Sequence, residues 1–550
     1  MRLRKAVLAV AMLVWSPSWS FGARSESASE SPDDAAAQVN RLLLDDELGD
    51  ESSRGDLLAP TVNDQVFLRR VWLDLVGQLP SPAEITRFCL DPRGDKRYRM
   101  VNRLLADERF GKNWSSYWRD VILYRRSEDR ALITAQALQE FLSEQFNANA
   151  PWDEIASQFV TARGDVREDG RTALIMAQAA SPEDTAAEIS RIFLGIQIQC
   201  AQCHDHPTDD WQREQFHQLA AFFPRLAIRR NPSAMRRSFL VVADDSPPRF
   251  ARRNNNNRRR GTLEHTMPDL DDPEAEGTIM QPALFATGQQ LELGVSDQER
   301  RNSLAQWMTA SDNPWFARAF VSRIWSELIG EGFYEPVDDM GPQRECSAPK
   351  TMEYLAREFA ENGHDVKWLF RTIMLTEAYG RESRPPRKYN EPPFTANRAH
   401  RLRADQLFSV LLAALNVDEQ SLLAHTVGPA RRIGQGGPRA VFNLAFGYDP
   451  SEPRAEIAGS IPQTLLLMNS PSIQSAMSAH RADGLGGLLQ QLDNDSQLVI
   501  ELYLRCLARE PTNSELRKCL MHIKRTGHRE EGFEDLLWAL INSTEFLHRS

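Results

Sequence analysis

Cys200-Ala201-Gln202-Cys203-His204 lies between two segments with helical periodicity. The spacing Cys-x-x-Cys-His is the one that attaches a c-type haem. Two thiols about one helical turn apart can each form a thioether with a haem vinyl group, and the adjacent imidazole can bind the iron from one face. The sequence therefore predicts a haem-binding turn, with Cys200 and Cys203 as anchors and His204 as the axial iron ligand.

The segments on both sides of this turn predict helices. Ser181 is followed by Pro182, which is the pattern of a serine N-cap with proline in the first turn. After Pro207, apolar residues that include Phe216 and Leu219 recur at helical spacing. Further amphipathic segments occur throughout the chain, so the predicted fold is mainly α.

The predicted architecture is two helical domains joined by a small β-containing, partly disordered insert. The segments are a signal peptide at 1–22, a loose acidic lead-in at 23–60 with one short helix near 35–44, a helical domain with the Cys-x-x-Cys-His motif at 61–225, a β/loop insert at 226–296 that includes an Arg/Asn-rich run, and a helical C-terminal domain at 297–548. Low-complexity polar composition is the reason for expecting disorder in the Arg/Asn-rich run.

The first residues have the pattern of a secretory signal. Arg2, Arg4 and Lys5 form a basic region, and residues 6–15 form an apolar stretch too short to cross a bilayer. Export to the periplasm or the extracellular space is therefore expected, with no membrane span after signal cleavage. Covalent haem attachment takes place outside the cytoplasm, so the signal and the motif agree.

Composition narrows the class of protein. The chain is 41% hydrophobic and 26% charged, which is typical of a globular protein. Its formal net charge of −11 argues against nucleic-acid binding. Six cysteines in 550 residues do not form a disulfide framework. Cys506 and Cys519 fall on two successive predicted helices, and the sequence leaves open whether they form a disulfide or remain free thiols.

Two metal-binding alternatives to haem remain open. Cys200, Cys203, His206 and His217 have a spacing that a structural zinc or iron site would accept, which would make the protein a non-haem scaffold or binding protein. A metal-dependent enzyme could instead use the pair His204 and His206. The sequence does not decide between an enzyme and a non-enzyme, and a plain Cys-x-x-Cys disulfide is a further possibility.

A haem iron would take a second axial ligand. His206 is too close to His204 in sequence to reach the opposite haem face easily, so it is expected to orient His204 from the second coordination shell. His217, on the following predicted helix, is better placed as the second ligand. His265 and Met267 are further candidates.

Several stretches resemble the planctomycete cytochrome-c-like (PSCyt-type) domain and its usual C-terminal companion domain. The stretches that resemble the first domain are 69–80 and 193–207, and those that resemble the companion are 304–318, 335–341 and 403–407. The resemblance implies an exported protein of a mostly uncharacterised family that is associated with polysaccharide-degrading systems. Together with the motif, the leading hypothesis is a haem c protein that transfers electrons to an unknown redox partner. The companion stretches contain five further polar residues that could line a site between the domains, but helix capping and buried ion pairs are the expected roles. These residues are Asp312, Asn313, Arg318, Asp338 and Asp339.

Overall fold

The computed structural model describes residues 30–47, 57–245, 263–272, 274–385, 387, 391–419, 438–454, 457 and 459–550. The predicted signal peptide and the Arg/Asn-rich run at 251–260 lie outside these residues. The fold is mostly helical with small antiparallel sheets, which confirms the predicted fold class. Among the described residues, no helix is both long enough and apolar enough to cross a bilayer.

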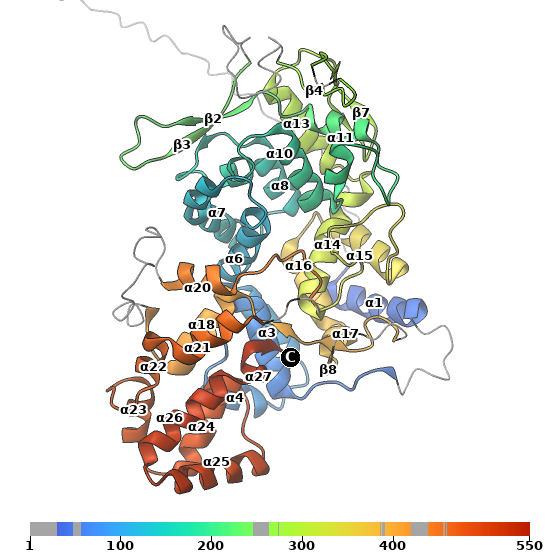
Figure 1. The fold of residues 1–550 in the computed structure, drawn as a ribbon. Coiled ribbons are helices and arrows are strands. Elements are labelled where there is room, and N and C mark those ends of the chain that lie inside the picture. Colours follow the sequence, from blue (N-terminus) through green and yellow to red (C-terminus); the bar gives the residue numbers. More distant parts are fainter. Residues whose placement is uncertain are drawn as a thin grey trace, which may run out of the picture.

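The N-terminal half is built from helices whose ends the sequence specifies locally (Figure 1). Asn63 caps the first turn of α3, and Gly77 ends that helix with a φ of 65°, a conformation that glycine adopts without strain. Ser81 and Glu84 form a capping box at the start of α4. The α-helices are α3 (Asp64–Val76), α4 (Pro82–Cys89), α5 (Lys96–Leu105), α6 (Arg109–Leu123), α7 (Ala135–Asn147), α8 (Trp152–Thr161), α9 (Ala173–Ala177), α10 (Pro182–Ile189) and α11 (Arg213–Ala220).

The insert contains the strands that its sequence predicted. Strands β2 (Leu226–Arg230) and β3 (Phe239–Ala243) pair antiparallel, and β1 (Gly164–Asp165) pairs with the other edge of β3. This sheet is thereby joined to the N-terminal helices. The remaining antiparallel pairs of the insert are β4 (Thr266–Met267) with β5 (Thr278–Ile279), and β6 (Ala283–Leu284) with β7 (Gln289–Gln290).

The C-terminal half is also helical, and short strand pairs connect its parts. Its α-helices are α13 (Asp297–Met308), α14 (Pro314–Ile329), α15 (Pro349–Glu361), α16 (Val366–Leu375), α17 (Glu377–Gly380), α18 (Ala404–Leu415), α20 (Pro438–Phe446), α21 (Ile461–Asn469), α22 (Pro471–Met477), α23 (Gly484–Gln491), α24 (Asp495–Leu507), α25 (Asn513–Thr526), α26 (Arg529–Ile541) and α27 (Thr544–Leu547). Strand β8 (Ser383–Arg384) pairs parallel with β9 (Asn397–Arg398), and β10 (His400–Arg401) pairs antiparallel with β11 (His548–Arg549). Cys506 and Cys519 are free thiols.

One hydrophobic core runs through both halves. Trp118 of α6 lies 4.4 Å from Trp152 of α8, measured between ring centroids, and Trp152 lies 4.5 Å from Phe320 of α14. Each such aromatic pair contributes about 0.5–1.5 kcal/mol beyond the area that it buries. The two predicted helical domains therefore pack against each other through apolar side chains rather than through a polar linker.

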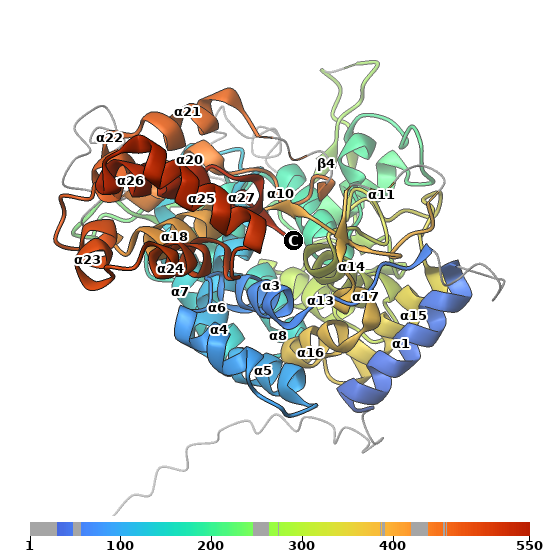
Figure 2. The ribbon, with the colours of Figure 1, turned by 90° about the horizontal axis from the view of Figure 1, so that it is seen from below.

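The predicted short helix near 35–44 is present in the lead-in, and it is longer than expected. Helix α1 (Pro32–Glu47) packs against α15 and α16 of the C-terminal half (Figure 2). Ala35, Val39 and Leu43 are buried at a four-residue spacing, which places them on one face of the helix. The acidic residues that suggested a loose segment occupy other positions of the same helix. Helix α1 is thus an integral part of the C-terminal half.

The last strand enters the N-terminal half and meets α3 (Figures 1 and 2). The Arg549 guanidinium contacts the Asp74 carboxylate, with Nη2 2.6 Å from Oδ2 and Nε 3.0 Å from Oδ1. The Tyr379 hydroxyl donates to Asp74 Oδ2 at 2.8 Å. Arg69 donates to the main-chain carbonyls of Glu545 and His548. We call Asp74, Tyr379 and Arg549 the Asp74 hub, and all three side chains are buried.

Candidate functional site

The turn that carries the motif lies between α10 and α11 (Figure 1). Helix α10 begins at the Ser181 cap, whose hydroxyl accepts from the Asp184 amide, and continues as one turn of π-helix over Ser190–Leu194. Single π-turns of this kind often occur at functional sites. Gly195 ends the π-turn with a φ of 68°, and a short 3₁₀-helix over Ile198–Gln202 then delivers the two cysteines.

The three predicted haem-binding residues are brought together at the surface. Cys200 and Cys203 are exposed free thiols, whereas Ile198 and Ala201 on the same turn are buried. His204 is exposed, and its Nδ1 lies 2.7 Å from the main-chain oxygen of Asp205. A carbonyl oxygen only accepts, so Nδ1 carries the proton and Nε2 of the neutral ring keeps its lone pair. Imidazoles that bind metals are commonly oriented by such a bond from the other ring nitrogen.

His217 and His265 form a buried pair behind this turn. His217 Nε2 lies 3.0 Å from the Gln202 carbonyl oxygen and therefore donates to it, and its Nδ1 lies 2.9 Å from His265 Nε2, which donates in turn. Nδ1 of His265 faces Glu183 Oε1 at 4.0 Å. Burial, together with the neighbouring His265, lowers the pKa of His217 to about 4, and burial lowers the pKa of His265 to about 4. Both rings are thus neutral at pH 7, and the pair fixes a carbonyl inside the motif.

The remaining predicted ligands lie around the turn in different ways. His206 is half-buried, its main-chain amide donates to the Trp211 carbonyl at 2.7 Å, and its Nδ1 accepts from the Thr208 amide at 3.4 Å. Met267, on β4, is also half-buried. Arg213 links the strand of Met267 to the motif, because its guanidinium donates to the Pro268 carbonyl at 2.6 Å and reaches the Gln202 carbonyl at 3.4 Å.

The predicted zinc set is not assembled in this structure. His217 uses both ring nitrogens in bonds to Gln202 and His265, so neither is turned toward Cys200 and Cys203. In the part of the chain that the structure describes, no three His, Cys, Asp or Glu side chains converge as metal ligands. The haem set requires only the two thiols and His204, and these are adjacent and exposed.

A buried ion cluster underlies the turn. Arg191 of the π-turn contacts Glu188 at 2.6 Å and Asp338 at 2.8 Å, and Arg323 of α14 contacts Asp338 at 3.0 Å. The Ser451 hydroxyl accepts from Arg191 at 2.7 Å. Burial alone would raise the pKa of the Asp338 carboxyl, but Arg191 and Arg323 hold it well below its usual range. Paired in this way, the charges connect the motif-bearing helix to the C-terminal half.

Two family models match the chain. Residues 44–227 match PSCyt2, described as a protein of unknown function (DUF1549), and residues 300–435 match PSD1, described as a protein of unknown function (DUF1553). Together these matches cover more than half of the sequence.

The chain contains a PSCyt2 domain and a PSD1 domain.

No curated protein and no solved structure is significantly similar to the chain. The motif turn lies within the PSCyt2 match, and Asp338 lies within the PSD1 match.

The structure also places the other residues that the sequence singled out in the PSD1 domain. Asn313 caps α14, since its side chain accepts from the Trp315 amide at 3.1 Å, and Asp338 lies in the buried ion cluster, as expected. Sequence reasoning missed the partner of Asp338, Arg191, because 147 residues separate the two. It also missed the burial of His217, although a signal existed. His217 follows Phe216 and precedes Ala220 by three residues, which places it on the apolar face of α11.

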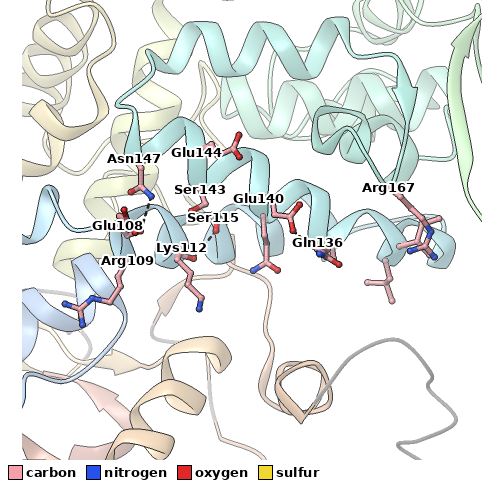
Figure 3. Close-up of a pocket in the computed structure, with 14 residues that line it drawn as sticks. Glu108, Arg109, Lys112, Ser115, Gln136, Glu140, Ser143, Glu144, Asn147 and Arg167 are labelled. Atoms are coloured by element: carbon pink, nitrogen blue, oxygen red, sulfur yellow. Dashed lines mark hydrogen bonds between the residues drawn. The ribbon is translucent and has the colours of Figure 1, made fainter. Parts of the chain in front are cut away.

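A hollow of about 760 Å³ lies beside α6 and α7 of the PSCyt2 domain (Figure 3). Polar side chains line it, and several of them bond within the protein. Asn147 donates to the Glu108 carbonyl, and Gln136 donates to Glu140. The motif residues do not line this hollow. It offers carboxylates and basic groups, among them Glu140 and Lys112, but no thiol or imidazole.

Proposed function

We propose that this PSCyt2–PSD1 protein is an exported c-type haem protein that transfers electrons. Cys200 and Cys203 would hold the haem through thioethers, and His204 Nε2 would bind the iron from one face. A bound haem supplies a reversible one-electron change at its iron. The observation that carries the proposal is the geometry of the turn, in which two exposed free thiols adjoin an imidazole whose Nδ1–H is held by the Asp205 carbonyl.

The residues of the turn fit the requirements of covalent attachment. The thiols are accessible to an incoming haem, and the bond from His204 Nδ1 fixes the tautomer that leaves Nε2 free for iron. The structural zinc or iron alternative has less support, because it needs His217, which is buried at 1% exposure and bonded at both nitrogens. An enzyme built on His204 and His206 would need a third ligand, and in the described residues no third side chain converges on them.

If haem is bound, Met267 would be the further side chain that holds its iron. His217 and His265 are buried and bonded to each other, whereas Met267 is partly exposed on the strand that Arg213 connects to the motif. A thioether sulfur is a common partner of histidine in haem c proteins and raises their potential. The electron partner would be another exported redox protein, and the resemblance of the family suggests a step linked to carbohydrate breakdown.

The proposal is tested by producing the chain with its signal in a host that matures haem c. The protein is expected to carry haem that stays with the denatured polypeptide after acid–acetone extraction. His204→Ala should keep the covalent haem but lose the wild-type visible spectrum. His206→Ala is the matched control and should keep both the haem and a nearly unchanged spectrum. Met267→Ala should change the spectrum without releasing haem.

The opposite results would favour the structural metal site. A colourless protein with about one equivalent of zinc, which is lost in His206→Ala and kept in His204→Ala, would overturn the haem proposal. Metal analysis of wild type, His204→Ala and His206→Ala separates these outcomes.

A further inference from the structure

The geometry points to a second part of the motif site, contributed by the PSD1 domain: the loop Asp338–Arg344 holds the chain on both sides of Cys200–His204 and positions it. The inference builds on the proposed haem function, because it names the residues that determine how the thiols and His204 are presented. We call residues 338–344 the PSD1 clasp.

The clasp holds the chain upstream of the motif. The Met340 amide donates to the Gly195 carbonyl at 2.7 Å, and Gln197 Nε2 donates to Asp338 Oδ1 at 2.9 Å. The Met340 side chain also packs so closely on Gly195 that a Cβ at position 195 would overlap its terminal methyl group. The turn after the π-helix therefore packs closely against the PSD1 clasp.

The clasp also holds the chain downstream of the motif. Arg344 Nη2 donates to the Thr208 hydroxyl at 3.0 Å, and Gln343 Nε2 donates to Asp210 Oδ2 at 3.0 Å. Between these bonds, the Asp209 side chain is 1% exposed and lies against Gly341. A Cβ at position 341 would overlap the Asp209 carboxylate, so only glycine leaves room for it.

The clasp is itself anchored, so its contacts can fix the motif. Asp338 is fully buried between Arg191 and Arg323, and a buried carboxylate with two guanidinium partners is costly to displace. Arg344 Nη2 also contacts Asp339 Oδ2 at 3.1 Å, which orients the guanidinium toward Thr208. The motif segment is thus tied to the PSD1 domain at its two ends and to His217 through the Gln202 carbonyl in its middle.

This arrangement makes the two domains one functional unit. The PSCyt2 domain supplies the thiols and His204, and the PSD1 domain supplies Met340, Gln343 and Arg344 as positioning residues. Anything that displaces the clasp would change the presentation of the motif without touching Cys200, Cys203 or His204.

The first test uses hydrogen exchange on the full mature chain made without haem. Gly341→Ala is expected to accelerate exchange in peptides spanning 196–212 at least ten-fold. Gly94→Ala is the matched control, because a Cβ at position 94 meets no atom within 4 Å, and it should behave as wild type. In an Asp209→Ala background the added methyl group has room, so Gly341→Ala should then have little further effect.

The second test removes only side chains at the surface of the clasp, in case Gly341→Ala fails to fold. The variant Gln343→Ala/Arg344→Ala should also accelerate exchange over 196–212. In protein matured with haem, it should lower the fraction of chains that carry covalent haem or alter the visible spectrum.

The outcomes separate the two proposals. Wild-type protein that never acquires haem would refute the haem function, while the exchange rates would still decide whether the clasp positions the motif. Haem-loaded protein with unchanged exchange and an unchanged spectrum in Gln343→Ala/Arg344→Ala would overturn the clasp.

Discussion

Asp74 of the hub and the motif turn both lie in the PSCyt2 match, but their surroundings are opposite. In the hub, the Asp74 carboxylate is buried and bonded to Arg549 and Tyr379. In the turn, Cys200 and Cys203 are exposed free thiols. Buried charged residues whose hydrogen bonds are all satisfied hold the structure together. Reactive groups that remain exposed are available to a ligand. A stretch that defines a family can therefore serve the fold or the chemistry, and burial distinguishes the two.

The largest expected effect is at the hub. Asp74→Ala leaves the Arg549 guanidinium buried without its counter-ion, and such a loss costs about 3–5 kcal/mol of the free energy of unfolding. The measurement is urea unfolding at pH 7, with Glu361→Ala as the control, since Glu361 and Arg357 are both more than half exposed and 3.9 Å apart. The double variant Asp74→Leu/Arg549→Met should lose less than Asp74→Ala. A loss under about 1 kcal/mol in Asp74→Ala would mean that the hub does not hold the halves together.

An intermediate effect is expected at the buried histidine pair, and it depends on pH. His217 and His265 have pKa values of about 4 in the folded protein, against a reference value of 6.5. The unfolded chain therefore binds protons between pH 6.5 and about 4 that the folded chain does not. Stability must fall as the pH falls through this window, by up to about 1.4 kcal/mol per pH unit for each histidine.

The histidine prediction is tested with His265→Gln. Glutamine can still donate to His217 but does not titrate, so the fall in stability between pH 6.5 and 4.5 should become shallower by about one proton. His400 is also buried, with a pKa lowered to about 3, and it should contribute the same slope to variant and wild type. His480→Gln, at a side chain that is 84% exposed, serves as the control. An identical pH profile for wild type and His265→Gln would show that the pair does not titrate as inferred.

The smallest effect on the free energy of unfolding is expected at the two thiols of the motif turn. In protein made without haem, Cys200→Ser/Cys203→Ser should change the free energy of unfolding by less than about 0.5 kcal/mol, because both side chains are exposed. The same variant should abolish covalent haem in protein made with a maturation system. A large loss of stability in the haem-free protein would show that the thiols stabilise the fold, as the Asp74 hub does.

Local features of the fold could be predicted from sequence, and long-range ones could not. The cap at Ser181 acts within a few residues, so its pattern predicted the start of a helix correctly. The separation into successive helical domains did not anticipate that α1 packs on the C-terminal half and that β11 enters the N-terminal half. No local pattern signals a contact between Asp74 and Arg549.

The site shows the same division. The adjacency of Cys200, Cys203 and His204 is local, and the structure places them together on one exposed turn. His217 was a candidate ligand because of its spacing from the motif. In the structure, it supports the motif from within the core, because it bonds to a main-chain carbonyl that no side-chain pattern reveals. The clasp was equally hidden, since its bonds join residues about 130–140 positions apart.

The Asp74 hub also imposes an order in time. Arg549 follows Asp74 by 475 positions, so a ribosome adding about 5–20 residues per second completes Asp74 roughly 20–100 s before its counter-ion exists. During that interval α3 has a carboxylate that must stay in water. The Asp74 hub can therefore form only after nearly the whole chain has been synthesised.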